Sequence, residues 1–289
     1  MAELEALTVS APATSANLGP GFDCLAVALD LGNAVVITRR PGPLEVRVTG
    51  EGAGELPEDG SNLVCRALAS GLPSLDDLAV ECRNRIPLGR GLGSSAAAAC
   101  AGLVAANALG ALRWTPDELL ARAAALEGHA DNAAASLLGG VVVVADGRAA
   151  RLPVPVQGRI VLWIPPTETH TSRSRAVLDD PVRREDAVFN VGRTALLVAA
   201  ITTGSVELLR TATQDRLHQD VRLRTATDSR AAIDAALDAG AWAAWLSGSG
   251  PSVAAWCAAG EAATVAANLP PAGRHRVVDI DTQGAHVEA

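Results

Sequence analysis

The stretch Pro87-Leu-Gly-Arg-Gly-Leu-Gly-Ser-Ser-Ala-Ala97 is the most informative part of the sequence. Its glycines recur within a short loop, so backbone N–H groups can turn inward without obstruction by a Cβ atom. The Ala-rich run over residues 96–112 predicts a helix whose positive end points at the same place. Loop and helix start together predict a cradle for an anion such as a triphosphate. The alternative is a tight strand-to-helix turn followed by close packing of small residues.

Two further glycine motifs flank this one in the chain. The first is Pro12-Ala-Thr-Ser-Ala-Asn-Leu-Gly-Pro-Gly-Phe-Asp23, which joins a strand to another apolar stretch. Its Gly-Pro-Gly imposes an unusual backbone and presents Asn17 and Asp23, although an ordinary loop would have the same pattern. The second is Ser247-Gly-Ser-Gly-Pro-Ser252, a turn between strands. It is suited either to approaching a phosphate or only to shaping a β-turn.

The composition excludes several kinds of chemistry. All 24 basic residues are Arg, and the sequence contains no Lys and no Tyr. A Walker-type P-loop, a protein kinase and a pyridoxal-phosphate enzyme each need a Lys, so these classes are excluded. The net charge of −8 argues against nucleic-acid binding, because the chain lacks the positive potential that attracts phosphates. With two Phe and no Tyr, it also has few aromatic side chains on which bases could stack.

The cysteines and the start of the chain predict a cytoplasmic protein. The five cysteines are odd in number, widely scattered and without a CxxC pair, which is typical of free thiols in a reducing compartment. Residues 1–5 contain no apolar segment, so no signal peptide is predicted. The apolar run 96–112 is interrupted by Asn107 and consists largely of weakly hydrophobic Ala. It predicts a buried helix rather than a membrane span.

The order of elements predicts the α+β class. Apolar residues alternate with period two over 44–49 and 80–86, which predicts strands. Thr115-Pro-Asp-Glu118 predicts a capping box for a helix over 116–127. Strands and hairpins intermix with helices without a regular βαβ rhythm. Further strands are predicted at 139–145, 148–154, 160–164, 242–246, 252–257 and 275–281, and further helices at 174–179, 184–203, 205–213, 228–238 (with Asp228 as N-cap) and 261–268.

The length of 289 residues suits one large domain or two of about 150 residues each. The segment 153–158 has the composition of a linker, which predicts domains over residues 1–153 and 154–289.

The three motifs together, in this order, resemble those of the GHMP kinase superfamily (galactokinase, homoserine kinase, mevalonate kinase and phosphomevalonate kinase). The middle motif is similar to the phosphate loop of that superfamily. The first motif, and Leu126-Glu-Gly-His-Ala-Asp-Asn132, resemble the homoserine kinase family in particular. The resemblance covers nearly the whole chain. It implies a two-domain GHMP kinase fold, with an N-terminal domain like ribosomal protein S5 domain 2 and a ferredoxin-like C-terminal domain. ATP and substrate would meet between these domains.

The resemblance implies that the chain phosphorylates L-homoserine with ATP, a step of threonine biosynthesis. Homoserine carries a carboxylate, an ammonium and a primary hydroxyl. Arg is well suited to bidentate pairing with the carboxylate. Arg175 lies in Thr171-Ser-Arg-Ser-Arg-Ala-Val-Leu178 and Arg222 in Asp215-Arg-Leu-His-Gln-Asp-Val-Arg222, and both segments resemble family patterns. The implied substrate-binding residues are Asn17, Asp23, His129, Asp131, Thr171, Arg175 and Arg222.

The resemblance also implies the remaining site residues. The implied catalytic residues are Asn17, Asp23, Glu127, His129, Asp131 and Asn132. ATP would be bound by Asn62, Pro87, Gly89, Arg90, Gly91, Leu92, Gly93, Ser94 and Ser95, and Mg²⁺ by Ser95 and Glu127. The family's scheme is direct in-line transfer without a dedicated base, and its members are often homodimers.

Two departures from the family pattern concern the site. Asp220-Val221 stands where the family has Pro-Tyr before the second Arg, which puts the local geometry of Arg222 in question. Ala133-Ala-Ala-Ser136 stands in place of the usual Val-Ala-Pro. Two other functions stay open. One is a GHMP kinase for an isoprenoid alcohol or a sugar, for which the two Arg residues and Asp23 would have no purpose. The other is an inactive protein of this fold that serves in binding or regulation.

Overall fold

Two long paired strands, β1 (Ala6–Asn17) and β2 (Gly21–Arg39), form the middle of the first sheet. The computed structural model describes residues 6–169, 171–178 and 181–288, without the side chains of residues 171–173. β2 pairs along its length with β4 (Leu78–Asn84) and with β5 (Val141–Ala145). The sheet has the order β11-β1-β2-β4-β3, and it is completed by β3 (Glu45–Gly50), β6 (Arg148–Leu152) and β11 (His286–Val287).

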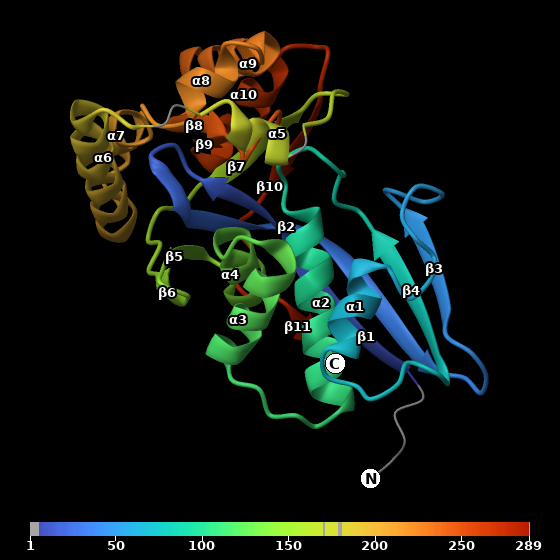
Figure 1. The fold of residues 1–289 in the computed structure, drawn as a ribbon. Coiled ribbons are helices and arrows are strands. Elements are labelled where there is room, and N and C mark those ends of the chain that lie inside the picture. The colour runs from blue at the N-terminus through green and yellow to red at the C-terminus, as the bar shows by residue number, and fades with distance from the viewer. Residues whose placement is uncertain (1–5, 170, 179–180, 289) are drawn as a thin grey trace.

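Four helices cover one face of this sheet (Figure 1). They are α1 (Leu63–Ala69), α2 (Ser94–Leu109), α3 (Pro116–Glu127) and α4 (Asp131–Leu138). α2 is the Ala-rich helix, and its buried small side chains let it pack closely against β1 and α1. This packing places the N-terminus of α2 at the edge where β1 turns into β2.

The second sheet has four antiparallel strands in the order β10-β7-β9-β8. Its strands are β7 (Arg159–Ile164), β8 (Ala243–Leu246), β9 (Val253–Cys257) and β10 (Arg274–Val278). α9 (Thr227–Asp238) and α10 (Ala262–Asn268) pack on it. The remaining helices are α5 (Thr171–Ala176), α6 (Arg184–Thr203), α7 (Val206–Ala212) and α8 (Gln219–Leu223).

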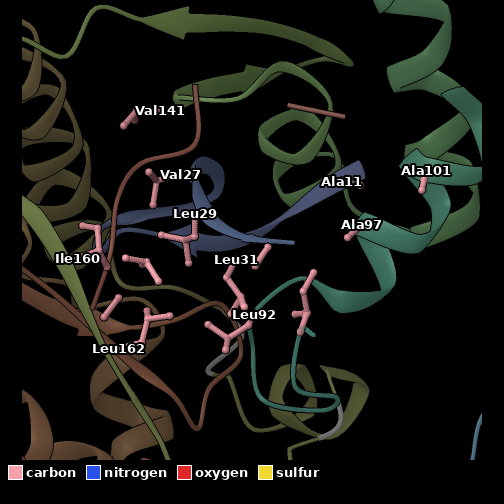
Figure 2. Packing of buried hydrophobic residues seen from close by; sticks show 14 of the residues in the cluster. Ala11, Val27, Leu29, Leu31, Leu92, Ala97, Ala101, Val141, Ile160 and Leu162 are labelled. Carbon is pink, nitrogen blue, oxygen red and sulfur yellow. The ribbon is translucent and has the colours of Figure 1, made fainter. Parts of the chain in front are cut away.

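One hydrophobic core joins the two sheets. Val27 and Leu29 of β2 lie in the same cluster as Ile160 and Leu162 of β7, and Ala97 of α2 belongs to it as well (Figure 2). The end of the chain returns to the first sheet, because β11 pairs antiparallel with β1. Both sheets therefore form a continuous packed unit around the β1–β2 connection. The division of the chain at residue 153 stays a prediction.

The structure confirms the α+β class, and most elements agree with the sequence. The Thr115–Glu118 capping box is formed at the start of α3, and α6 has the predicted bounds. Asp146 and Gly147 both have positive φ in the hairpin between β5 and β6, as a tight two-residue turn requires. The predicted N-cap Asp228 is wrong. Ala226 is the N-cap of α9, and Asp228 lies in the first turn, where a negative charge favours the helix start.

All five cysteines are free thiols, as the sequence predicts, and four of them are buried. Burial raises the pKa of Cys65 to about 11 and that of Cys82 to about 12. Among the described residues, no helix combines the length and the apolar character that crossing a membrane requires.

Candidate active site

A cavity of about 490 Å³ lies between the glycine loop at 87–95 and the β1–β2 connection. Its wall also includes the C-terminal end of α3, the N-terminal end of α4, the turn at 248–249 and residues from α5 and α8. The side chain of Thr171, one of the residues predicted for the site, lies outside the described part of the chain. The lining residues among the predictions are Asn17, Asp23, Asn62, Pro87, Gly89, Arg90, Gly91, Leu92, Gly93, Ser94, Ser95, Glu127, His129, Asp131, Asn132, Arg175 and Arg222.

The glycine loop ends in an uncapped helix start. Gly89, Gly91 and Gly93 have φ of 63°, 69° and 67°, a region that glycine occupies without steric penalty. Gly93 is the N-cap of α2, and no side chain accepts a hydrogen bond from the first turn. The first N–H groups of α2 are thus available to an acceptor in the cavity. This arrangement has the features of an anion-binding helix start.

The turn Ser247–Ser252 supports this loop from the other side. Ser247 Oγ donates to the Gly91 carbonyl at 2.7 Å. A Cβ atom on Gly91 would lie 2.2 Å from the Ser247 carbonyl oxygen, so only glycine allows this approach. The third motif therefore packs against the glycine loop, which neither of its two interpretations included. Its approach to a phosphate stays a prediction.

The guanidinium of Arg90 points toward the segment after β7. It donates to the carbonyls of Leu88, Pro165 and Pro166 at 2.6, 3.2 and 2.8 Å, and to Glu168 at 3.1 Å. These hydrogen bonds fasten the glycine loop to the segment that leads into α5. Contact of Arg90 with the nucleotide stays a prediction, and the residue lines the cavity.

Ser95 and Glu127 meet at the helix start. The Ser95 hydroxyl donates to Glu127 Oε1 across the gap between α2 and α3. Burial raises the pKa of the Glu127 carboxyl, and the bond from Ser95 opposes this shift. Mg²⁺ usually binds one or two carboxylates together with phosphate oxygens and water, so this pair fits an ion that arrives with a nucleotide. Within residues 6–169, 171–178 and 181–288, no group of three or more His, Cys, Asp or Glu forms a metal cage.

The opposite end of the cavity carries an ion pair. Arg175 Nη1 and Nη2 donate to the two carboxylate oxygens of Asp23 at 2.9 and 2.6 Å. Arg175 Nε donates to His129 Nε2 at 3.1 Å. Because His129 accepts at Nε2, its imidazole is neutral in this arrangement, with the proton on Nδ1. Asp23, His129 and Arg175 therefore form one hydrogen-bonded group, although they are far apart in the sequence.

The β1–β2 connection holds Asp23 in place. Asn17 Oδ1 accepts from the backbone N–H of Asp23 at 3.1 Å, and Asn17 Nδ2 donates to the Gly248 carbonyl at 3.0 Å. Asn17, Leu18 and Asp23 have φ of 72°, 48° and 58°, which non-glycine residues adopt rarely. Such backbone strain persists only where the surroundings fix it, and it is common at functional sites.

Asp131 and Asn132 start α4 beside the phosphate loop. Asp131 is buried, with 3% of its surface exposed, and its Oδ1 accepts from the Asn132 backbone at 2.7 Å. Burial raises the pKa of the Asp131 carboxyl, and the bond from Asn132 opposes the shift. Asn132 Oδ1 accepts from the Thr14 hydroxyl at 2.7 Å, which ties α4 to β1.

Arg222 is buried and nevertheless reaches the cavity. It donates from Nε to the Ser174 carbonyl at 3.3 Å, and from Nη1 to His218 Nδ1 at 3.0 Å and to the Gly248 carbonyl at 3.2 Å. Burial, together with the charge of Arg175, lowers the pKa of Arg222 to about 10. Asp220 lies on α8 and pairs with Arg230, so the departure from the family's Pro-Tyr leaves Arg222 at the cavity.

Two asparagines, Asn62 and Asn33, line the cavity at its wall, and only Asn62 was predicted from the sequence. Asn62 is the N-cap of α1, where it accepts from the Val64 N–H at 3.0 Å and donates to the Pro57 carbonyl at 2.8 Å. Asn33 was not predicted, although it lines the cavity and accepts from the backbone N–H groups of Arg85 and Ile86 at 2.8 and 3.0 Å. No local pattern around Asn33 marks it, because its partners lie in the segment that follows β4.

The architecture and the helix-start cradle define a class of enzyme. The model of the GHMP kinase N-terminal domain matches residues 62–140, and that of the GHMP kinase C-terminal domain matches residues 197–274. The mevalonate kinase of Methanococcus jannaschii superimposes with a TM-score of 0.72 at 12% identity, covering 96% of this chain and 99% of that chain, which shows the fold alone.

Relatives that are more similar in sequence narrow the class. The homoserine kinase of Corynebacterium kroppenstedtii is 44% identical over 262 residues, which cover 86% of this chain and 84% of the relative. That of Moorella thermoacetica is 43% identical over 258 residues, covering 86% of each. The crystal structure of homoserine kinase from Cytophaga hutchinsonii superimposes with a TM-score of 0.91 at 29% identity, covering 100% of this chain and 99% of that chain. The chain therefore belongs to the homoserine kinase family of the GHMP kinases. It is an ATP-dependent small-molecule kinase with the two-domain α+β fold of that superfamily.

Proposed function

We propose that the chain transfers the γ-phosphoryl group of ATP to the side-chain hydroxyl of L-homoserine, in the cytoplasm, as a step of threonine biosynthesis. One observation supports this most directly. A single cavity has an uncapped helix start at one end and two guanidinium groups with a carboxylate at the other. The first end suits a polyphosphate, and the second suits a zwitterionic amino acid.

The nucleotide phosphates would lie against the glycine loop and the start of α2. Backbone N–H groups and the helix dipole supply the positive potential there, so no Lys is needed. Asn62 shapes the neighbouring wall through its cap on α1. Leu92 belongs to the hydrophobic core, and so it would contribute its backbone rather than its side chain.

The amino-acid substrate would bind beside the β1–β2 connection. Its carboxylate suits Arg175 and Arg222, and its ammonium suits Asp23. When a zwitterion separates the Asp23–Arg175 pair, its ammonium becomes the partner of Asp23 and its carboxylate the partner of Arg175. Each side chain thus keeps an opposite charge beside it. His129, Asp131 and the side chains of Asn17 and Asn132 then surround the hydroxyl, and Thr171 remains a proposed contact of the substrate.

The transfer itself would be direct and in line. The homoserine oxygen forms a bond to the γ-phosphorus, the bond from this phosphorus to the β–γ bridging oxygen breaks, and the hydroxyl proton leaves with the phosphate or solvent. Asp23 is held by Arg175 through both oxygens, which suits it to binding rather than to taking a proton. Positioning and charge stabilisation then supply the rate, as in other phosphoryl transfers.

Mg²⁺ would be held by Glu127 and Ser95 together with the phosphates. Bound there, the ion would neutralise charge on the transferring phosphoryl group. A half-buried carboxylate whose pKa is raised by burial gains from a cation, since the ion compensates for lost hydration.

A coupled assay of ADP release with a panel of alcohols tests the proposal. L-Homoserine is the expected substrate, and 3-aminopropanol and 4-hydroxybutyrate, which each lack one charge, should react far more slowly. Turnover of mevalonate or a sugar without turnover of L-homoserine would overturn it. Light scattering tests the further proposal that the chain forms a homodimer.

A further inference from the structure

His218 is a buried histidine next to the cavity to which the proposed reaction gives no role. It has 0% of its surface exposed, and its ring stacks on that of Phe22 with a centroid distance of 5.1 Å. Both ring nitrogens have a partner. Nδ1 lies 3.0 Å from Arg222 Nη1, and Nε2 lies 2.7 Å from the carbonyl oxygen of Gly19.

These partners fix the protonation of the ring. A guanidinium can only donate, so Nδ1 of His218 must accept from Arg222. A carbonyl can only accept, so Nε2 must carry the proton that is donated to Gly19. His218 is therefore the neutral Nε2–H tautomer. Burial and the nearby charge of Arg222 lower its pKa, while Asp215, 3.7 Å from Nε2, and Asp23 act in the opposite direction.

The bond from Arg222 determines which donors of this guanidinium are used. Three of its five N–H groups are directed to Ser174, His218 and Gly248. The two hydrogens of Nη2 have no acceptor among the described residues, and Nη2 is not among the fully buried polar atoms without a partner. Because Arg222 lines the cavity, Nη2 is the part of the guanidinium that can meet a carboxylate there.

His218 also joins two segments that form the site. Gly19 lies in the β1–β2 connection, shortly before Asp23 on β2, whereas Arg222 lies on α8. The start of α8 is fixed by Asp215, whose carboxylate accepts from the backbone N–H groups of His218 and Gln219 at 2.8 and 2.6 Å. The histidine thus has a rigid backbone position from which to orient both partners.

We propose that His218 is a positioning residue that holds Arg222 so that Nη2 faces the substrate carboxylate. Through Gly19, His218 also anchors the β1–β2 connection, which lies just before Asp23 in the chain. This inference rests on the proposed amino-acid substrate. It assigns the histidine of the Asp215-Arg-Leu-His-Gln-Asp-Val-Arg222 motif a function in substrate affinity rather than in the chemical step.

Two conservative variants separate its two hydrogen bonds. In His218→Asn the amide oxygen can take the place of Nδ1 and accept from Arg222, but the bond to Gly19 is lost. In His218→Gln the amide nitrogen can take the place of Nε2 and donate to Gly19, but the acceptor for Arg222 is lost. His218→Ala removes both, and His275→Gln, an exposed position on β10, is the matched control.

We expect His218→Ala and His218→Gln to raise the KM for L-homoserine by about tenfold or more, because a bond to a charged group is lost. His218→Asn should raise it clearly less, and the KM for ATP should stay within about twofold in all folded variants. Thermal midpoints measured in parallel show whether each variant is folded. An unchanged KM for L-homoserine in both His218→Ala and His218→Gln, or a larger loss in His218→Asn than in His218→Gln, would overturn the assignment.

A second measurement does not depend on turnover. In ¹⁵N-labelled wild-type protein, Nδ1 of His218 should give the resonance of an unprotonated ring nitrogen and Nε2 that of a protonated one, and the reverse pattern would also overturn the assignment. Failure of the proposed function has a different signature, since the wild-type enzyme itself would then not turn over L-homoserine.

Discussion

Asp23 and Arg175 form the centre of the proposed substrate site because they are bonded through both carboxylate oxygens. Replacing Asp23 with Asn removes the charge for the ammonium and leaves the reacting hydroxyl and phosphates untouched. We expect Asp23→Asn to raise the KM for L-homoserine by roughly tenfold or more, with kcat reduced by less than about threefold. Asp30→Asn, at an exposed position on the same strand, is the control. A collapse of kcat by orders of magnitude with intact binding would instead make Asp23 a catalytic base.

Glu127 illustrates how one residue can favour function at a cost in stability. Burial raises the pKa of its carboxyl in the folded chain, so the folded protein binds a proton more readily than the unfolded one. The free energy of unfolding therefore rises as pH falls through the range between the unfolded and folded pKa values. Above this range the ionised carboxylate destabilises the fold.

Glu127→Gln should thus raise the thermal midpoint in metal-free buffer at pH 8. The gain should shrink as the pH is lowered, because wild-type Glu127 then takes up its proton in the folded state. The same variant should lose roughly a hundredfold or more in kcat, because a group that stabilises developing charge is gone. Scanning calorimetry at several pH values, with Glu207→Gln at an exposed position on α7 as the control, tests the sign. A midpoint that falls at pH 8 would contradict this account.

Among the elements, those with a clear local signal were predictable. The capping box gave the start of α3, and Asp146-Gly147 gave the hairpin. α1, α4 and α8 were not predicted. At the start of α4 and of α8, no side chain at the N-cap hydrogen-bonds to the first turn. Their start depends on tertiary contacts, such as the carboxylate of Asp215 on the backbone of α8.

The contact between the glycine loop and the turn at 247–252 leads to a prediction about stability. Gly91 and Gly147 have nearly the same φ, 69° and 72°. A Cβ atom on Gly91 would lie 2.2 Å from the Ser247 carbonyl oxygen, whereas one on Gly147 would meet no atom within 4 Å. Ala at either position costs about 1 kcal/mol from its left-handed conformation. Gly91→Ala should lose about 1–3 kcal/mol more because of the clash, and it should also raise the KM for ATP. Denaturant unfolding of both variants measures how much the contact between residue 91 and Ser247 contributes to the loss in free energy of unfolding. Equal losses in the two variants would show that the turn at 247–252 moves to accommodate the added methyl group.

For the whole molecule, the sequence predicted many of the residues that line the cavity but not how they are joined. The motifs marked Asp23, His129 and Arg175 separately, whereas their hydrogen bonds connect three distant segments. The sequence also did not reveal Asn33 or the bridge made by His218, because each has a backbone partner that only the fold brings near. The glycine motif indicated that Arg90 lies at the cavity, but it did not indicate which way the side chain points.

Arg90 gives a prediction about how the two halves of the molecule work together. Its guanidinium binds the carbonyls of Pro165 and Pro166, and the segment that they start leads into α5 and Arg175. Arg90→Ala should therefore raise the KM for both ATP and L-homoserine several-fold and lower the free energy of unfolding by about 2 kcal/mol. Glu168→Gln removes only the exposed ion pair, so it should cost less than about 1 kcal/mol.

Steady-state kinetics and denaturant unfolding of these two variants distinguish a fastening role from direct contact with the nucleotide. A fastening residue couples the loop to α5, so both KM values and stability must change together. If Arg90→Ala raised only the KM for ATP and left unfolding unchanged, the side chain would leave the Pro165 and Pro166 carbonyls to bind phosphate. The glycine loop would then depend on Ser247 and the helix start alone for its position.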